Sequence, residues 1–238
     1  MIENSLTTER IINIVMCIDG TGSMVPFVDN LKANVNKLYP EFVNRFDDFN
    51  SEFTSMRVKV IVFRDYREDG DEAMVQSKFF ELPNEEEEFE KFINGIEAAG
   101  GGDMPENGLE ALYLAMKSDF TSGSKDRQFI VLFTDADALP LKAREGEANY
   151  PRDMVDEEGL LDIWNCSQHD ESVKLKEKNK RLILYAPYGS YYMHMCKKDT
   201  GFNRCIFKEF DANSGLSDVP FDDIIDTIFR FGYGYLDY

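Results

Sequence analysis

The chain is poor in histidine, cysteine and tryptophan, and it lacks long apolar segments. Of its 238 residues, two are histidine, four are cysteine and one is tryptophan. The longest apolar runs, such as residues 11–18 and 129–133, are far too short to cross a bilayer, and the amino end shows no basic-then-apolar signal pattern. We therefore expect a soluble cytoplasmic protein.

The few cysteines are irregularly spaced, which is not typical of a disulfide-stabilised fold. Cys17 lies in a run that we expect to be buried, so reduced thiols are predicted. His194, Cys196 and Cys205 would give zinc only three loosely spaced ligands. We therefore expect structural thiols in a tyrosine-rich loop rather than a zinc site.

Basic residues are scarce compared with acidic ones. The chain has 26 Lys and Arg against 45 Asp and Glu, which gives a net charge of -19. This charge repels the phosphates of nucleic acids and anionic lipid surfaces. We expect no nucleic-acid and no membrane partner, and a cation or a basic protein surface is favoured instead.

Short apolar runs alternate with segments of helical period, which predicts an α/β fold with a mostly parallel sheet and helices on both faces. The strands are expected at residues 11–18, 58–63, 74–82, 129–133, 182–185 and 205–207. The helices are expected at residues 27–46, 85–95, 109–116, 160–164 and 221–231. Pro40 should kink or end the first helix near Leu38 or Tyr39. With 43% hydrophobic residues and no domain-sized break in composition, the chain should form one domain.

Three oxygen-bearing side chains occupy every second position directly after the first expected strand, namely Asp19, Thr21 and Ser23. The carboxyl ends of strands in open α/β sheets form binding sites, and the intervening glycines let the backbone fold closely. A carboxylate with two hydroxyls suits Mg²⁺ or Mn²⁺. The alternative is a simple turn in which Ser or Thr caps the next helix.

Two further acidic loops follow along the chain. Asp135 and Asp137 come after the strand at residues 129–133, and the strand-end position favours Asp135. Asp103 and Glu106 come after the glycine run at residues 100–102. Asp-x-x-Glu also forms a capping box, so metal ligation by Asp103 and helix capping both stay open. Three oxygen-bearing loops together favour a metal site.

These motifs resemble the metal-ion-dependent adhesion site of von Willebrand factor type A domains. The matching segments are Asp19-x-Thr21-x-Ser23, Gly100-Gly-Gly-Asp103-x-Pro105-Glu106 and Phe133-Thr134-Asp135. The resemblance covers residues 11–187 in matching order. It implies a Rossmann-like single domain spanning residues 1–238, with a strand and helix at 205–231 packed on the 11–187 core. It also implies Mg²⁺ or Mn²⁺ held by Asp19, Thr21, Ser23, Asp103 and Asp135, although Asp103 replaces a Thr and Ala136 a Gly of the family pattern.

The resemblance implies a binding module rather than an enzyme, in which the ion bridges to a carboxylate of a partner protein. Segment 63–67, Phe-Arg-Asp-Tyr-Arg, further resembles bacterial and intracellular members that are associated with kinases and phosphatases in stress-response or signalling systems. On its own, Arg64-Asp65-Tyr66-Arg67 is expected to be a surface salt-bridge cluster. The alternative function is a phosphohydrolase of the haloacid-dehalogenase type. It is disfavoured because Cys17 occupies the position of the nucleophilic Asp.

Overall fold

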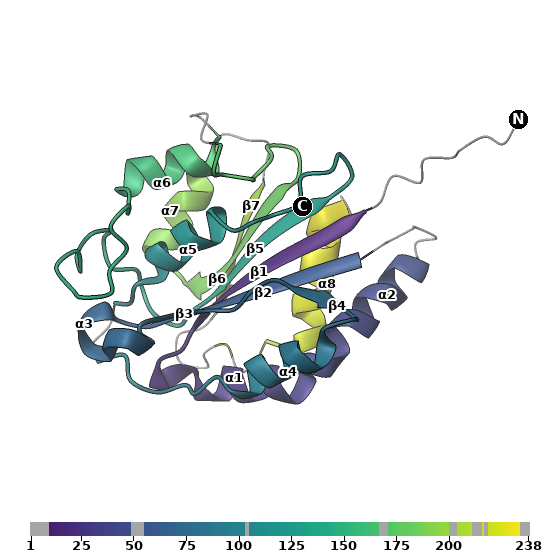
Figure 1. The fold of residues 1–238 in the computed structure, drawn as a ribbon, viewed down its shortest axis with the longest axis horizontal. Helices are drawn as coiled ribbons and strands as arrows, with labels where there is room; N and C mark the ends of the chain where they lie inside the picture. The colour runs from purple at the N-terminus through teal and green to yellow at the C-terminus, as the bar shows by residue number, and fades with distance from the viewer. Residues whose placement is uncertain are drawn as a thin grey trace, which may run out of the picture.

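The computed structural model describes residues 10–48, 55–102, 105–166, 171–199, 204–210, 216 and 219–233. At its centre is a seven-stranded sheet with the order β3-β2-β1-β5-β6-β7, in which β4 also pairs with β2 (Figure 1). The parallel strands are β1 (Ile11–Asp19), β2 (Ser55–Phe63), β5 (Arg127–Phe133), β6 (Lys180–Pro187) and β7 (Cys205–Phe210). Two short strands, β3 (Met74–Gln76) and β4 (Phe80–Leu82), run antiparallel to β2. The predicted α/β class with a mostly parallel sheet is confirmed.

Helices cover both faces of this sheet (Figure 1). One face is covered by α1 (Val25–Asn34), α2 (Leu38–Asp48), α4 (Glu86–Asn94) and α8 (Phe221–Tyr233). The other face is covered by α5 (Gly108–Met116), α6 (Glu157–Trp164) and α7 (Tyr191–Lys197), while α3 (Tyr66–Asp69) follows β2. None of the helices among the described residues combines the length and the apolar character that a membrane span needs.

Strand β1 lies between two separate apolar cores. Its side chains alternate between the faces of the sheet, so one set enters each core. Those facing α1, α4 and α8 are Ile12, Ile14, Met16 and Ile18, and those facing α5 are Val15 and Cys17. This explains why the run reads as continuously apolar in the sequence, since a central parallel strand has no solvent face.

The first helical segment breaks slightly earlier than predicted. Helix α1 ends at Asn34, and the 3₁₀ turn Val35–Lys37 joins it to α2. Pro40 therefore lies in the first turn of α2, where its missing N–H costs no hydrogen bond. The weak strand predicted at residues 74–82 consists of β3 and β4, which both pair with β2.

Two expectations about the segment after β6 are wrong. Residues 191–197 form helix α7 rather than a loop, and Cys196 and Cys205 form a disulfide rather than staying reduced. The end of α7 and the start of β7 lie next to each other, with the two Cα atoms 5.0 Å apart, which is within the range that a disulfide requires. The spacing along the sequence does not reveal this, because the contact arises only when β7 pairs with β6.

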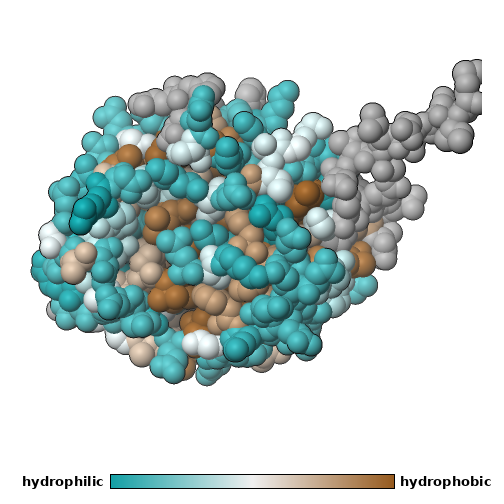
Figure 2. Space-filling view, viewed as in Figure 1, coloured by the Kyte–Doolittle hydropathy of each residue, from teal (hydrophilic) through white to brown (hydrophobic). Residues whose placement is uncertain are grey.

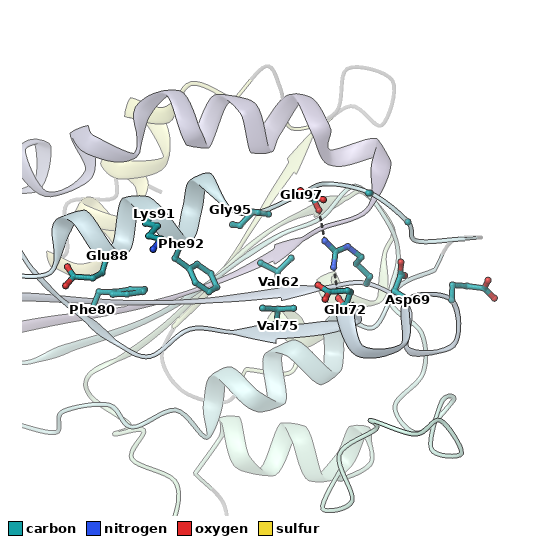
Figure 3. A pocket seen from close by; sticks show the side chains of 15 residues that line it. Val62, Asp69, Glu72, Val75, Phe80, Glu88, Lys91, Phe92, Gly95 and Glu97 are labelled. Atoms are coloured by element: carbon teal, nitrogen blue, oxygen red, sulfur yellow. Dashed lines mark hydrogen bonds between the residues drawn. The ribbon is translucent and has the colours of Figure 1, made fainter.

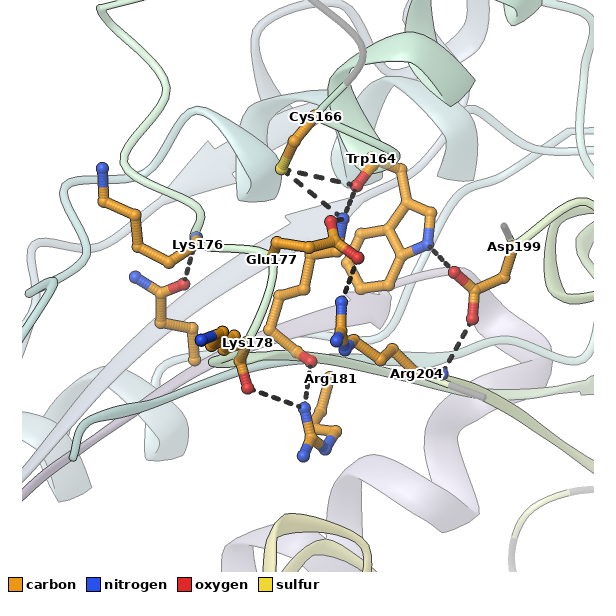
Figure 4. Close-up of polar contacts among 10 residues, drawn as sticks. Trp164, Cys166, Lys176, Glu177, Lys178, Arg181, Asp199 and Arg204 are labelled. Atoms are coloured by element: carbon orange, nitrogen blue, oxygen red, sulfur yellow. Dashed lines mark hydrogen bonds and ion pairs between the residues drawn. The ribbon is translucent and has the colours of Figure 1, made fainter. Parts of the chain in front are cut away.

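A buried lysine at the start of β6 contacts Trp164 and Glu177, both of which are labelled in Figure 4. The Lys180 ammonium pairs with the Glu177 carboxylate at 2.7 Å, donates a hydrogen bond to the Trp164 carbonyl and lies 4.7 Å from the centre of the Trp164 ring. Glu177 also pairs with Arg204. Trp164 itself is buried, and its indole N–H donates to Asp199 at 3.1 Å.

Candidate functional site

The candidate site lies where β1 and β5 end. Asp19 is the last residue of β1 and is fully buried, while Asp135 is the second residue after β5. The two strands are parallel neighbours, with Ile18 opposite Phe133 in the register. The loops that follow them therefore start side by side, which is why residues more than one hundred positions apart meet here.

Hydrogen bonds join four oxygen-bearing side chains into one continuous chain. Asp19 Oδ1 accepts from the Thr21 hydroxyl at 2.7 Å and from the Thr21 amide at 2.9 Å. The Thr21 and Ser23 hydroxyl oxygens are 3.2 Å apart, and the Ser23 hydroxyl donates to Asp135 Oδ1 at 2.9 Å. The structure thus brings together four of the five predicted site residues. The fifth, Asp103, lies outside the described residues.

Thr134 is a further residue of the site, and the sequence motifs did not assign it a role. It is fully buried, and its hydroxyl donates to Asp19 Oδ2 at 2.6 Å. Both carboxylate oxygens of Asp19 are therefore held by hydroxyl donors from two loops. The signal was present in the sequence, since Thr134 directly follows the apolar run of β5 and precedes Asp135.

The structure separates Asp135 from Asp137. Asp137 Oδ1 accepts from the backbone amides of Ala138 and Tyr191, each at 2.7 Å. It thereby fixes the start of α7 and makes no contact with Ser23. Asp135 is the residue that joins the hydroxyl chain, in agreement with the preference for the position nearest the strand end.

Glu106 also lies at the site, although the sequence suggested a capping role for it. Helix α5 begins only at Gly108 with Asn107 as its N-cap, so a capping box starting at Asp103 is wrong. The backbone of Glu106 pairs with the loop after β5, because its amide donates to the Asp137 carbonyl at 3.0 Å. Its side chain is 1% exposed, and Oε2 has no hydrogen-bond partner among the described residues.

Gly101 lets Thr21 and Glu106 approach each other from two loops. Its φ is +90°, and a Cβ at this position would lie 2.4 Å from Thr21 Cγ2 and 3.1 Å from Glu106 Oε1. Only glycine fits such a position without strain and collision. The glycine run thus has a definite purpose, which is to bring its backbone against the first loop.

The site carries negative charge that the described residues do not neutralise. Burial raises the pKa of Asp19 to about 6, although hydrogen bonds from Thr134 and Thr21 partly oppose this rise. Burial raises the pKa of Glu106 to about 8, and the nearby carboxylates, Asp19 and Asp135 among them, add to this rise. Neither these carboxylates nor Asp135 forms an ion pair within the described part of the chain. Ionising the site without a cation is therefore unfavourable.

The arginine next to the site does not supply that cation. The Arg64 guanidinium donates to the backbone carbonyls of Gly20, at 2.8 Å, Glu72 and Glu97. Arg64 and Asp65 are both buried, and Asp65 pairs with Arg144. The expectation of a surface salt-bridge cluster at residues 64–67 is thus wrong for its first three residues, since Tyr66 is buried as well.

The donor set suits a hard divalent cation. No group of three or more His, Cys, Asp or Glu side chains is placed for metal binding among the described residues, which exclude Asp103. The set depends instead on the hydroxyls of Thr21 and Ser23 together with carboxylates, and the unpartnered Glu106 oxygen lies close by. Mg²⁺ and Mn²⁺ prefer such oxygen ligands and retain positions for water or a further ligand.

The residue that would have to act as nucleophile in the alternative function is unsuited to catalysis. Cys17 is fully buried within β1, and its thiol points to the Ala111 carbonyl, with Sγ and O 3.7 Å apart. Burial raises the pKa of this thiol, so it stays protonated. The phosphohydrolase alternative therefore gains nothing from the structure.

Comparison with known proteins gives a family match and a set of similar folds. Residues 74–146 match the model of the von Willebrand factor A domain, a segment that includes the glycine run, Glu106 and Asp135 but not the first loop. The search of curated proteins gives no match.

Three similar solved structures have low sequence identity and therefore show the fold alone. They are the pilus adhesin SpaC from Lactobacillus rhamnosus GG (TM-score 0.56, 11% identity), a von Willebrand factor type A protein from Catenulispora acidiphila (0.53, 11%) and proximal thread matrix protein 1 of the mussel byssus (0.53, 12%). They cover 94%, 92% and 94% of this chain, whereas this chain covers only 31%, 42% and 48% of theirs. The chain thus spans less than half the length of each of these three proteins.

Proposed function

We propose that this chain binds a protein partner through a divalent cation, because it has the fold of von Willebrand factor type A structures and its residues 74–146 match the model of that family. Asp19, Thr21, Ser23 and Asp135 would hold Mg²⁺ or Mn²⁺, and Asp103 would add a ligand from the second loop. The ion would supply a positive charge with an open position that a carboxylate of the partner fills. Domains of this family typically mediate protein–protein interactions, and they are generally not enzymes.

One observation carries the proposal. Four oxygen-bearing side chains from two loops converge at the strand ends, and the carboxylates among them have no positive partner in the described structure. A capped turn explains the hydroxyls, but it does not explain a buried Glu106 beside Asp19 whose Oε2 has no hydrogen-bond partner among the described residues. A bound cation accounts for both features.

Apolar side chains are exposed to solvent at the same end of the sheet, near the carboxyl ends of the strands. Among the described residues, the large apolar side chains that are well exposed are Val25, at 41%, and Tyr188, at 76%. Val25 is the first residue of α1, two positions after Ser23, and Tyr188 directly follows β6, so both lie near the carboxyl ends of strands. Exposed Tyr is typical of residues that dominate protein interfaces, and this supports a protein partner at the site.

The cellular context is proposed from segment 63–67 and from the disulfide. The resemblance of segment 63–67 to kinase- and phosphatase-associated family members makes such a signalling system the first place to look for the partner. The sequence predicts the cytoplasm, whereas the Cys196–Cys205 disulfide favours an oxidising compartment. Labelling of free thiols in freshly isolated protein would decide between the two.

Calorimetric titration of Mg²⁺ and Mn²⁺ into metal-stripped protein tests the proposal. We expect one saturable site in the wild type, its loss in Asp19→Ala and Ser23→Ala, and its retention in Asp119→Ala. Asp119 is an exposed carboxylate near the amino end of β2, at the opposite end of the strands from the site, so it controls for general acidity. Binding that disappears equally in Asp119→Ala, or no binding in the wild type, would contradict the metal site. Capture of the partner should in turn fail in EDTA.

A further inference from the structure

A groove of about 870 Å³ lies between helix α4 and the antiparallel edge of the sheet (Figure 3). Its floor consists of apolar side chains from β2, β3, β4 and α4 and from the segment after α4, namely Val62, Val75, Phe80, Phe92 and Ile96. Figure 2 shows hydrophobic residues gathered at the centre of this view with hydrophilic residues around them. The volume is in the range of binding sites rather than of packing defects.

The rim of the groove is predominantly acidic. Five carboxylates line it, those of Glu68, Asp69, Glu72, Glu88 and Glu97. Glu88 lies beside Lys91 at one end, while Asp69, Glu72 and Glu97 lie toward the other (Figure 3). Arg64 also lines the groove, but it donates to the backbone carbonyls of Glu72 and Glu97 rather than to their carboxylates. The acidic end is therefore left with an excess of negative charge.

The groove lies next to the candidate metal site. Its lining includes Asp69 and Gly100. The Asp69 carboxylate accepts a hydrogen bond from the Gly101 amide at 3.2 Å, and Gly101 in turn lies against Thr21 and Glu106. A single bound molecule could therefore contact the groove and the strand-end site together.

We propose that the groove binds a basic, apolar segment of the protein partner. Large apolar side chains of that segment would cover the floor, and its Lys or Arg side chains would face the acidic rim. The inference deepens the proposed function and takes from it only that the partner is a protein. Charge excludes the main competitors, because a second copy of this chain, with its net charge of -19, and any nucleic acid or anionic lipid would be repelled by the rim.

The test uses a synthetic probe of alternating Lys and Leu, blocked at both ends so that it has no carboxylate, and a matched peptide with Glu in place of Lys. In calorimetry at physiological salt, we expect saturable binding of the Lys–Leu peptide and none of the Glu–Leu peptide. Affinity should fall about tenfold or more in the double variant E72Q/E97Q, which keeps the backbone carbonyls that Arg64 needs.

Two further variants separate the groove from general acidity. E158Q/E171Q removes two exposed carboxylates in and after α6, on the other face of the sheet, and should leave binding unchanged. Val75→Lys places a positive charge on the half-buried floor at an edge strand and should abolish binding, while circular dichroism checks that it folds. Phe92→Ala gives a second floor variant if Val75→Lys does not fold.

Each outcome bears on the groove separately from the metal. Equal losses in E158Q/E171Q and E72Q/E97Q, unchanged binding in a folded floor variant, or no binding in the wild type would overturn the inference. Because the probe has no carboxylate, EDTA and Mg²⁺ should not change its affinity. Absence of peptide binding together with an intact Mg²⁺ site would contradict only the groove proposal. Peptide binding without a Mg²⁺ site would contradict only the proposed metal site.

Discussion

The two ends of the parallel strands differ in whether their buried charges have partners of opposite charge. At the start of β6, the Lys180 ammonium is fully buried and has a carboxylate, a carbonyl and an aromatic face as partners. At the end of β1, Asp19 and Glu106 are as deeply buried, but they face other carboxylates and have no cation among the described residues. The described residues pair the buried charge at the start of β6 with an opposite one, and at the end of β1 they do not. Under the proposed function, a bound ion would supply the positive charge there.

The largest effect is expected from breaking the neutralised cluster. Replacing Lys180 by Met removes the ammonium and leaves Glu177 and the Trp164 carbonyl without it, so the free energy of unfolding should fall by about 3 kcal/mol. Urea denaturation measures this change, with the exposed Lys178→Met as its control. If the free energy of unfolding falls no more than in Lys178→Met, this cluster contributes little to stability. The contrast between the two ends of the strands would then disappear.

An intermediate effect is expected from titrating the buried carboxylates near the end of β1, which have no cationic partner among the described residues. Asp19 and Glu106 have raised pKa values in the folded protein, about 6 and about 8. The folded state therefore binds more protons than the unfolded state above about pH 4, and stability falls as pH rises toward 8. In EDTA, the Tm at pH 8 should be about 5 °C or more below that at pH 5.

Glu106→Gln sharpens this test, because it removes the group with the larger pKa shift. The variant should flatten the pH dependence of Tm and be more stable than the wild type at pH 8 in EDTA. A wild-type Tm that rises between pH 5 and pH 8 in EDTA would show that the carboxylates are compensated by some other group.

The smallest effect concerns a carboxylate near the site that has its own cation. Burial opposes ionisation of Asp65, but hydrogen bonds from Arg144 and the Arg67 amide, with the charges of both arginines, outweigh it and lower its pKa. Stability from this pair is present above pH 3.8 and is lost as the pH falls further. Arg144→Gln should cost about 1 kcal/mol at pH 7. Urea unfolding should show a smaller cost at pH 3 than at pH 7, and the exposed Arg152→Gln should show no such cost at either pH.

The sequence predicts much of the fold because burial leaves a local pattern. β1 reads as a continuous apolar run since both of its faces are covered, and the first loop is recognisable from the alternation of Asp19, Thr21 and Ser23. The seven-residue helix α7 is missed because it is short and rich in aromatic residues, which favour strands as much as helices.

The remaining features depend on contacts between distant segments. Glu106 has the spacing of a helix cap, and only its pairing with the loop after β5 places its side chain beside Asp19. The Cys196–Cys205 disulfide similarly requires β7 to lie next to β6. Such contacts follow from topology, and no local motif encodes them.

The most direct measurement is the Tm of the wild type and of Asp19→Asn, each in EDTA and in Mg²⁺. Asn keeps the shape of the side chain and one acceptor oxygen while it removes the charge. If the carboxylates form a cation-binding site, Asp19→Asn should raise the Tm in EDTA, and Mg²⁺ should raise the Tm of the wild type but not of the variant. If Asp19→Asn instead lowers the Tm in EDTA and Mg²⁺ leaves the wild type unchanged, Asp19 only holds a turn together, and the account of a metal-dependent binding site is contradicted.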